Sequence, residues 1–147
     1  MWEAITCNKV FNAAMVSWFV AQASKVILLL ITSKRFKVRK FLQTGGMPSS
    51  HSSMVMTLCI CVARLYDFTS PLFGVCLVFA IITMHDAAGV RRAAGKQARV
   101  LNRMIEEWDN ADPEFLEKRL IEFLGHTPIE VVAGGILGVY IGLVMPL

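Results

Sequence analysis

Four apolar stretches constrain this chain more than any other feature of its sequence. They cover about residues 10–32, 50–66, 71–90 and 128–146. A helix needs ~20 mainly apolar residues to cross the hydrocarbon core of a bilayer. Hydrophobic residues make up 55% of the 147-residue chain, and its mean hydropathy of +0.55 is too high for an ordinary soluble domain. The sequence therefore predicts one all-α membrane domain over residues 1–147, a polytopic helical bundle with about four transmembrane helices.

Glycines recur every four residues in the last apolar stretch, at Gly134, Gly138 and Gly142. Residues four apart lie on the same side of a helix, and small residues there let two helix backbones approach closely. We therefore expect this side of the last helix to pack tightly against another helix.

A polar segment over about residues 91–124 separates the third and fourth apolar stretches. It is basic at its start and acidic later, and apolar residues then recur at helical spacing from Phe115 to Leu124. This spacing is typical of an amphipathic helix that lies on a membrane or on the bundle. We expect such a helix on the cytoplasmic side.

Positive charge is concentrated in two loops. Residues 34–40 contain five basic side chains and no acidic one, residues 91–103 are also basic, and the 67–70 turn carries no basic residue. By the positive-inside rule, this distribution predicts an integral protein of the cell membrane with both termini outside and both basic loops in the cytoplasm. The net charge of +4 is modest, and we expect no nucleic-acid partner.

The stretch GGMPSSHSS at residues 45–53 opens the second apolar stretch. Its glycines allow a sharp turn, Pro48 suits the start of a helix, and Ser49 or Ser50 can cap that helix. Free backbone amides, hydroxyl groups and the imidazole of His51 together make a natural anion site. The alternative is a serine-rich N-cap beside an incidental histidine.

The stretch LGHTPIE at residues 124–130 opens the last helix. Thr127 as N-cap, Pro128 at the first helical position and Glu130 at the third would form a capping box. Alternatively, His126 is a nucleophile or base, and Glu130 orients its other ring nitrogen. Both interpretations hold if Glu130 serves two partners.

Lys25 interrupts the first apolar stretch, where a lysine costs about 2.5–3.5 kcal/mol on insertion scales. It either extends to the nearer interface or faces the bundle interior and neutralises an anion.

Small and basic residues alternate over residues 86–98, which include Asp86, Arg91 and Arg92. With the predicted topology, the three polar motifs converge on the cytoplasmic face, which favours a shared site.

Residues 48–52, PSSHS, resemble the second signature of the type-2 phosphatidic acid phosphatase superfamily, which includes the vanadium haloperoxidases. Residues 125–138 resemble the third signature, a histidine followed four residues later by Asp and then by a glycine-rich helix. Nearly the whole chain resembles a divergent branch of haloperoxidase-related membrane proteins. The first signature, K-x-x-x-x-x-x-R-P, is absent as written, and Glu130 and Ser50 replace the usual Asp and Gly.

The resemblance implies a membrane phosphatase that hydrolyses a lipid phosphate monoester, phosphatidate-like or polyprenyl phosphate, without a metal or other cofactor. His126 would form a phosphohistidine, Glu130 would orient it, and His51 would be the general acid. The residues expected at the substrate phosphate are Ser49, Ser50, Lys25, Arg91, Arg92 and Asp86.

A second hypothesis is a non-catalytic membrane protein that binds anionic lipid headgroups, or a transport-related protein on a phosphatase-like scaffold. A cation beside two neighbouring histidines favours catalysis, whereas widely separated histidines favour binding alone. Four spans leave much lateral surface, so a homo-oligomer is compatible with either hypothesis.

Overall fold

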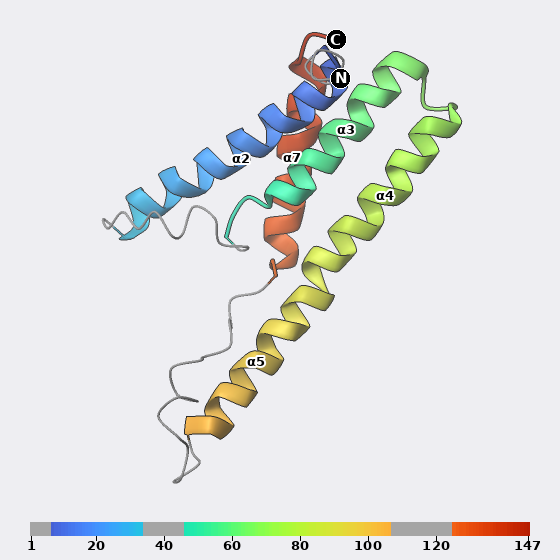
Figure 1. Ribbon diagram of the computed structural model, residues 1–147. Helices are drawn as coiled ribbons and strands as arrows, with labels where there is room; N and C mark the ends of the chain where they lie inside the picture. The colour runs from blue at the N-terminus through green and yellow to red at the C-terminus, as the bar shows by residue number, and fades with distance from the viewer. Residues whose placement is uncertain (1–6, 34–45, 107–124) are drawn as a thin grey trace.

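The computed structural model describes residues 7–33, 46–106 and 125–147, and these form five helices and no strand (Figure 1). The helices are α2 (Lys9–Ser33), α3 (Ser50–Tyr66), α4 (Pro71–Ala88), α5 (Val90–Glu106) and α7 (Pro128–Val144). Helix α3 is central and packs against α2, α4 and α7, whereas α5 packs against α4. The predicted all-α class is confirmed.

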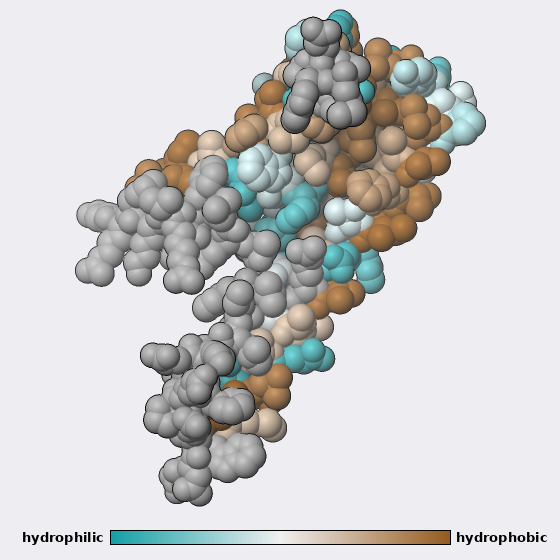
Figure 2. All heavy atoms as spheres, viewed as in Figure 1, coloured by the Kyte–Doolittle hydropathy of each residue, from teal (hydrophilic) through white to brown (hydrophobic). Residues whose placement is uncertain are grey.

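Two helical stretches are long and apolar enough to cross a membrane, Lys9–Leu28 and Pro71–Ile105, and α7 is a shorter apolar helix. Helix α4 exposes large apolar side chains along its length, and brown surface dominates that side of the molecule in Figure 2. Soluble monomers rarely expose apolar surface on this scale. The chain is a helical membrane protein, as predicted, and the crossing of the bilayer by all four apolar helices stays a prediction.

Side-chain caps define where three of these helices begin. The Ser49 hydroxyl accepts from the Ser52 amide at the start of α3, and Ser70 caps α4 ahead of Pro71. At the start of α7, Thr127 and Glu130 form the predicted capping box. These bonds satisfy amides that have no partner inside a helix.

Helices α3 and α7 are in backbone contact through the three glycines. A methyl group at Gly134 would overlap the carbonyl of Ser49, and one at Gly138 would overlap the carbonyl of Ser53. The Thr57 hydroxyl oxygen also lies 2.9 Å from the Gly138 carbonyl oxygen. The predicted close packing of this glycine face is confirmed.

Arg64 joins the far ends of the same two helices. Its Nη1 donates to the carbonyl oxygens of Gly142, at 2.7 Å, and Met145, at 2.8 Å. Carbonyls in the last turn of a helix have no intrahelical donor, so a charged donor there stabilises the end of α7.

The backbone leaves helical geometry at Gly89, between α4 and α5, where φ is −102° and ψ is −84°. Helix α5 then extends beyond the ends of α3 and α7 (Figure 1). The basic loop at 34–40 and the amphipathic helix predicted from Phe115 to Leu124 lie outside the described residues.

The chain direction places the polar motifs at one end of the bundle. The starts of α3 and α7 lie together at the end opposite to the C-terminus of the chain (Figure 1). This arrangement results from antiparallel connections between α2, α3 and α4. The motifs around His51 and His126 are therefore neighbours in space.

Gly138→Ala tests the contact between α3 and α7. We expect the variant to be less stable by about 1–3 kcal/mol, because the added methyl meets backbone that has to move. The measurement is the midpoint of thermal unfolding in detergent. The matched control is Gly74→Ala in α4, where nothing lies within 4 Å of an added Cβ, so its midpoint should stay or rise. Equal midpoints for the two variants would contradict close packing at Gly138.

Candidate active site

Two backbone hydrogen bonds join the polar motifs at the end of the bundle. The amide of Ser49, ahead of α3, donates to the carbonyl of Glu130 in α7 at 3.0 Å. The amide of His126 donates to the carbonyl of Ala87 in the last turn of α4 at 2.9 Å. Segments that are far apart in sequence thus meet at one place, which confirms the predicted convergence.

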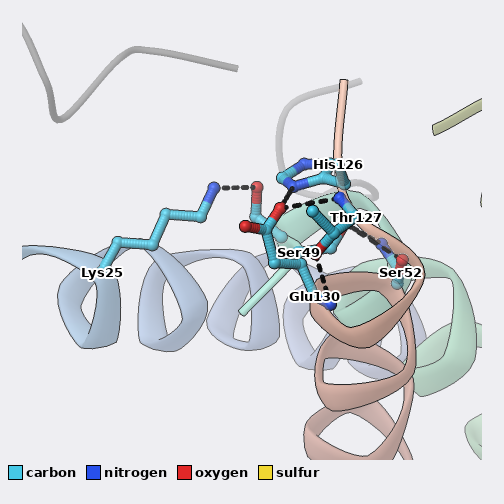
Figure 3. Close-up of polar contacts among 7 residues, drawn as sticks. Lys25, Ser49, Ser52, His126, Thr127 and Glu130 are labelled. Carbon is cyan, nitrogen blue, oxygen red and sulfur yellow. Dashed lines mark hydrogen bonds and ion pairs between the residues drawn. The ribbon is translucent and has the colours of Figure 1, made fainter. Parts of the chain in front are cut away.

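His126 lies at the centre of this site and is 2% exposed. Its Nδ1 is 3.1 Å from Oε2 of Glu130 (Figure 3). An ionised carboxylate only accepts hydrogen bonds, so in the neutral imidazole Nδ1 carries the proton and Nε2 keeps its lone pair. Nε2 is buried and has no hydrogen-bond partner among the described residues. A buried, oriented and unpaired imidazole nitrogen is suited to nucleophilic or basic chemistry.

A single carboxylate oxygen of Glu130 accepts two hydrogen bonds. Its Oε2 accepts from the Thr127 amide at 3.0 Å as part of the capping box, and from His126 at 3.1 Å. The two interpretations of this motif therefore hold together. The start of α7 and the tautomer of His126 depend on the same carboxylate.

His51 approaches His126 from the first turn of α3. The two ring centroids are 6.3 Å apart, and the ring planes meet at 65°. His51 is only partly buried, whereas His126 is enclosed. The two imidazoles are close enough to act on one bound group, and the more accessible one lies nearer to solvent.

Lys25 extends toward this site from α2 (Figure 3). It is 6% exposed, so its side chain faces the bundle interior rather than the interface. Its Nζ donates to the Ser50 hydroxyl at 3.3 Å, and no carboxylate of the described residues forms an ion pair with it. An ammonium group has three donors, and a buried charge is costly unless an opposite charge compensates it. The Glu130 carboxylate attracts this ammonium group without a direct ion pair, so Lys25 keeps donors for a further partner.

Buried hydroxyl groups continue from the site into the bundle. The Ser52 hydroxyl donates to the Ser49 hydroxyl at 3.0 Å, and the Ser17 and Ser53 hydroxyl oxygens are 2.6 Å apart. Ser49 is among the site residues predicted from the sequence, whereas Ser17 and Ala87 are not. Ala87 contributes only its backbone carbonyl, which no side-chain pattern reveals. Ser17 has a signal, since it lies eight residues before Lys25, two helical turns along the same side of α2.

The remaining predicted phosphate ligands lie at or beyond the end of α4. Asp86 is in the last turn of α4, next to Ala87. Arg91 and Arg92 are on α5, and Arg92 is exposed, with no polar contact to His126 within the described part of the chain. The phosphate-binding role of these three residues stays a prediction. Residues 7–33, 46–106 and 125–147 contain no group of three or more His, Cys, Asp or Glu side chains that could hold a metal ion.

The surroundings of His126 lower its pKa below the ordinary value of 6.5, and burial is the largest cause. The hydrogen bond and charge of Glu130 act in the raising direction, as does the Gly46 backbone, whereas the charge of Lys25 lowers the pKa further. Burial disfavours the imidazolium because a charged ring loses more hydration than a neutral one. His126 is therefore neutral at pH 7, with a free lone pair on Nε2.

Lys25 and Glu130 act on the pKa of His126 in opposite directions, so removing each charge should shift this pKa in opposite directions. Lys25→Met removes a positive charge and should raise the pKa of His126, whereas Glu130→Gln removes the carboxylate and should lower it further. Glutamine at this position retains the capping box, so α7 should still begin at the same residue. The measurement is an NMR pH titration of ¹⁵N-labelled histidine in detergent, with His126→Gln used to assign the signal. Shifts in the same direction would contradict this electrostatic picture.

Comparison with known proteins agrees with the resemblance described above. Residues 6–141 match the family described as the Divergent PAP2 family. The chain is also 42% identical over 135 residues to the uncharacterized membrane protein YuiD of Bacillus subtilis strain 168, which covers 85% of each chain. No solved structure matches the chain. Since the family match extends over nearly the whole chain, this protein belongs to the Divergent PAP2 family.

Proposed function

We propose that this protein is a membrane phosphatase that hydrolyses a lipid phosphate monoester through a phosphohistidine on His126. One observation carries the proposal: Nε2 of His126 is buried and has no partner among the residues that the structure describes, while Nδ1 is held by Glu130. A histidine with only a structural role has no need of an unsatisfied buried nitrogen. Membership of the Divergent PAP2 family agrees with a phosphatase-like scaffold.

The reaction follows from the two imidazoles. The Nε2 lone pair of His126 attacks phosphorus and forms a P–N bond as the P–O bond to the alcohol breaks. His51 gives its proton to the departing alkoxide. Water then attacks phosphorus, the P–N bond breaks, and His51 takes the proton from water. Glu130 stabilises the positive charge that develops on His126 in the first step.

The cation on Lys25 and the start of α3 are the proposed phosphate ligands. Lys25 has one hydroxyl partner and supplies the positive charge that a phosphate requires. Ser49 and Ser50 border the same place, and amides in the first turn of a helix attract anions. Asp86, in the last turn of α4, and Arg91 and Arg92, at the start of α5, are the further proposed residues at the phosphate.

A membrane location accounts for the proposed lipid substrate. We place the site at the cytoplasmic face, because the basic segments 34–40 and 91–103 border the ends of the helices that carry it. A lipid anchored in the bilayer can present its phosphate to the start of α3 at this face. The apolar chains of the lipid then stay in the membrane. Phosphatidate and polyprenyl phosphates have this form.

The second candidate is non-catalytic binding of an anionic headgroup. The observation that favours it is the absence of the first signature, so that Lys25 alone replaces the lysine and arginine of the family pattern. With Lys25 as its cation, the site is better suited to bind a phosphate with a single charge than to stabilise the transition state of phosphate transfer, which carries more negative charge.

Release of phosphate by the purified protein in detergent, from a panel of lipid phosphates, tests the proposal. We expect His126→Ala to lose on the order of 10⁴-fold or more of the activity, and His51→Ala to lose about 10²–10⁴-fold. The matched control is His85→Ala, which removes an exposed histidine of α4 and should leave the rate unchanged.

Retained turnover in folded His126→Ala would exclude this residue as the nucleophile. Absence of release from every lipid by folded wild-type protein, together with phosphate-dependent binding that requires Lys25, would establish headgroup binding instead.

A further inference from the structure

Helix α5 separates its charged and apolar side chains onto different sides. Arg92, Lys96, Arg99 and Arg103 follow each other at intervals of three or four residues, which places them in one stripe. On the other side, Val90, Val100, Leu101 and Met104 are 48–63% exposed. We call these two sets the basic stripe and the apolar side of α5.

The exposed apolar side is not part of the bundle core. Among the described helices α5 packs only against α4, and Figure 1 shows it beyond the ends of α3 and α7. A third side, with Gly95, Ala98 and Asn102, is buried. Large apolar side chains that stay exposed on one side of a helix, while another side is buried, indicate that a further apolar environment covers them.

The charge of α5 is strongly one-sided. Its 17 residues contain five basic side chains and one acidic side chain, Glu106 at the last position. A helix with a large apolar side, a cationic side and low mean hydropathy is the type that lies in a membrane interface. Each basic residue near an anionic leaflet strengthens such binding by electrostatic attraction.

The position of α5 after α4 also suits a membrane surface. The 18 residues of α4 extend over ~27 Å, close to the thickness of the hydrocarbon core. If α4 crosses the bilayer, Gly89 lies near its surface, and the backbone dihedral angles depart from helical values at this residue. A change in chain direction at Gly89 would bring the apolar side of α5 against the acyl chains.

We propose that α5 is a membrane-surface helix that binds anionic phospholipid, with its apolar side in the interface and its basic stripe toward the headgroups. A second copy of the chain is the less suitable occupant, because pairing two α5 helices brings together two helices that each carry five basic side chains and one acidic side chain. The proposal is independent of catalysis.

Site-directed spin labelling of the full chain tests this proposal. A nitroxide is placed at Leu101→Cys or Met104→Cys on the apolar side, and at Lys96→Cys on the basic stripe. The background variant is Cys7→Ser, since Cys7 is exposed and the other three cysteines are buried. The protein is reconstituted in vesicles of phosphatidylcholine with or without phosphatidylglycerol. Collision with oxygen and with a water-soluble nickel chelate then gives the depth of each label.

With phosphatidylglycerol, we expect the labels at Leu101 and Met104 to be immersed and the label at Lys96 to stay in water. Arg92→Gln combined with Lys96→Gln should reduce the ratio of immersed to aqueous Leu101 label on the order of tenfold. High salt should have a similar effect. The matched control, Lys9→Gln at the exposed start of α2, should leave this ratio unchanged.

Three outcomes would overturn the proposal. Aqueous labels at Leu101 and Met104 in both kinds of vesicle would show that α5 stays away from the bilayer. Equal immersion in both kinds would exclude a requirement for anionic lipid. Dipolar broadening that disappears on dilution with unlabelled protein would assign the apolar side to a second copy of the chain.

Discussion

The backbone contact between α3 and α7 determines the rest of this structure. Gly134 and Gly138 leave no room for a side chain against the carbonyls of Ser49 and Ser53, so the two helices meet at the closest distance that their backbones allow. That distance lets the Ser49 amide reach the Glu130 carbonyl at one end, while Arg64 holds the last turn of α7 at the other. Fixed at both ends, α3 and α7 hold the imidazoles of His51 and His126 beside each other.

In the proposed reaction, groups that stabilise the fold also take part in the chemistry. Glu130 would be needed for the start of α7 in any case, and the same oxygen orients His126. One oxygen has both roles because every buried polar group needs a partner in surroundings of low dielectric. Against that background, two groups are exceptions within the described part of the chain: Nε2 of His126 has no partner there, and Lys25 has the Ser50 hydroxyl as its hydrogen-bond partner. Exceptions to polar satisfaction are concentrated at functional sites.

The cations of the chain divide into two groups with different surroundings. Lys25 is enclosed within the bundle, where a positive charge acts strongly on His126 because little water screens it. The basic residues of α5 lie outside the bundle core, where solvent screens them and where many weak contacts with a charged surface add together. We therefore propose two separate roles for the basic residues, one at the site around His126 and the other at the membrane surface along α5.

The sequence by itself determined the membrane class, the helix starts and the closely packed glycine side of α7, because these depend on local chemistry: apolar length, capping side chains and the spacing of glycines. It predicted that the polar motifs converge, since charge in the loops orients each helix. Only the tertiary structure decided between the alternatives for Lys25 and Glu130, because burial and hydrogen-bond distance depend on which helices are neighbours. Ala87 shows the same limit: its backbone carbonyl holds the His126 amide, and no side-chain pattern in the sequence reveals this hydrogen bond.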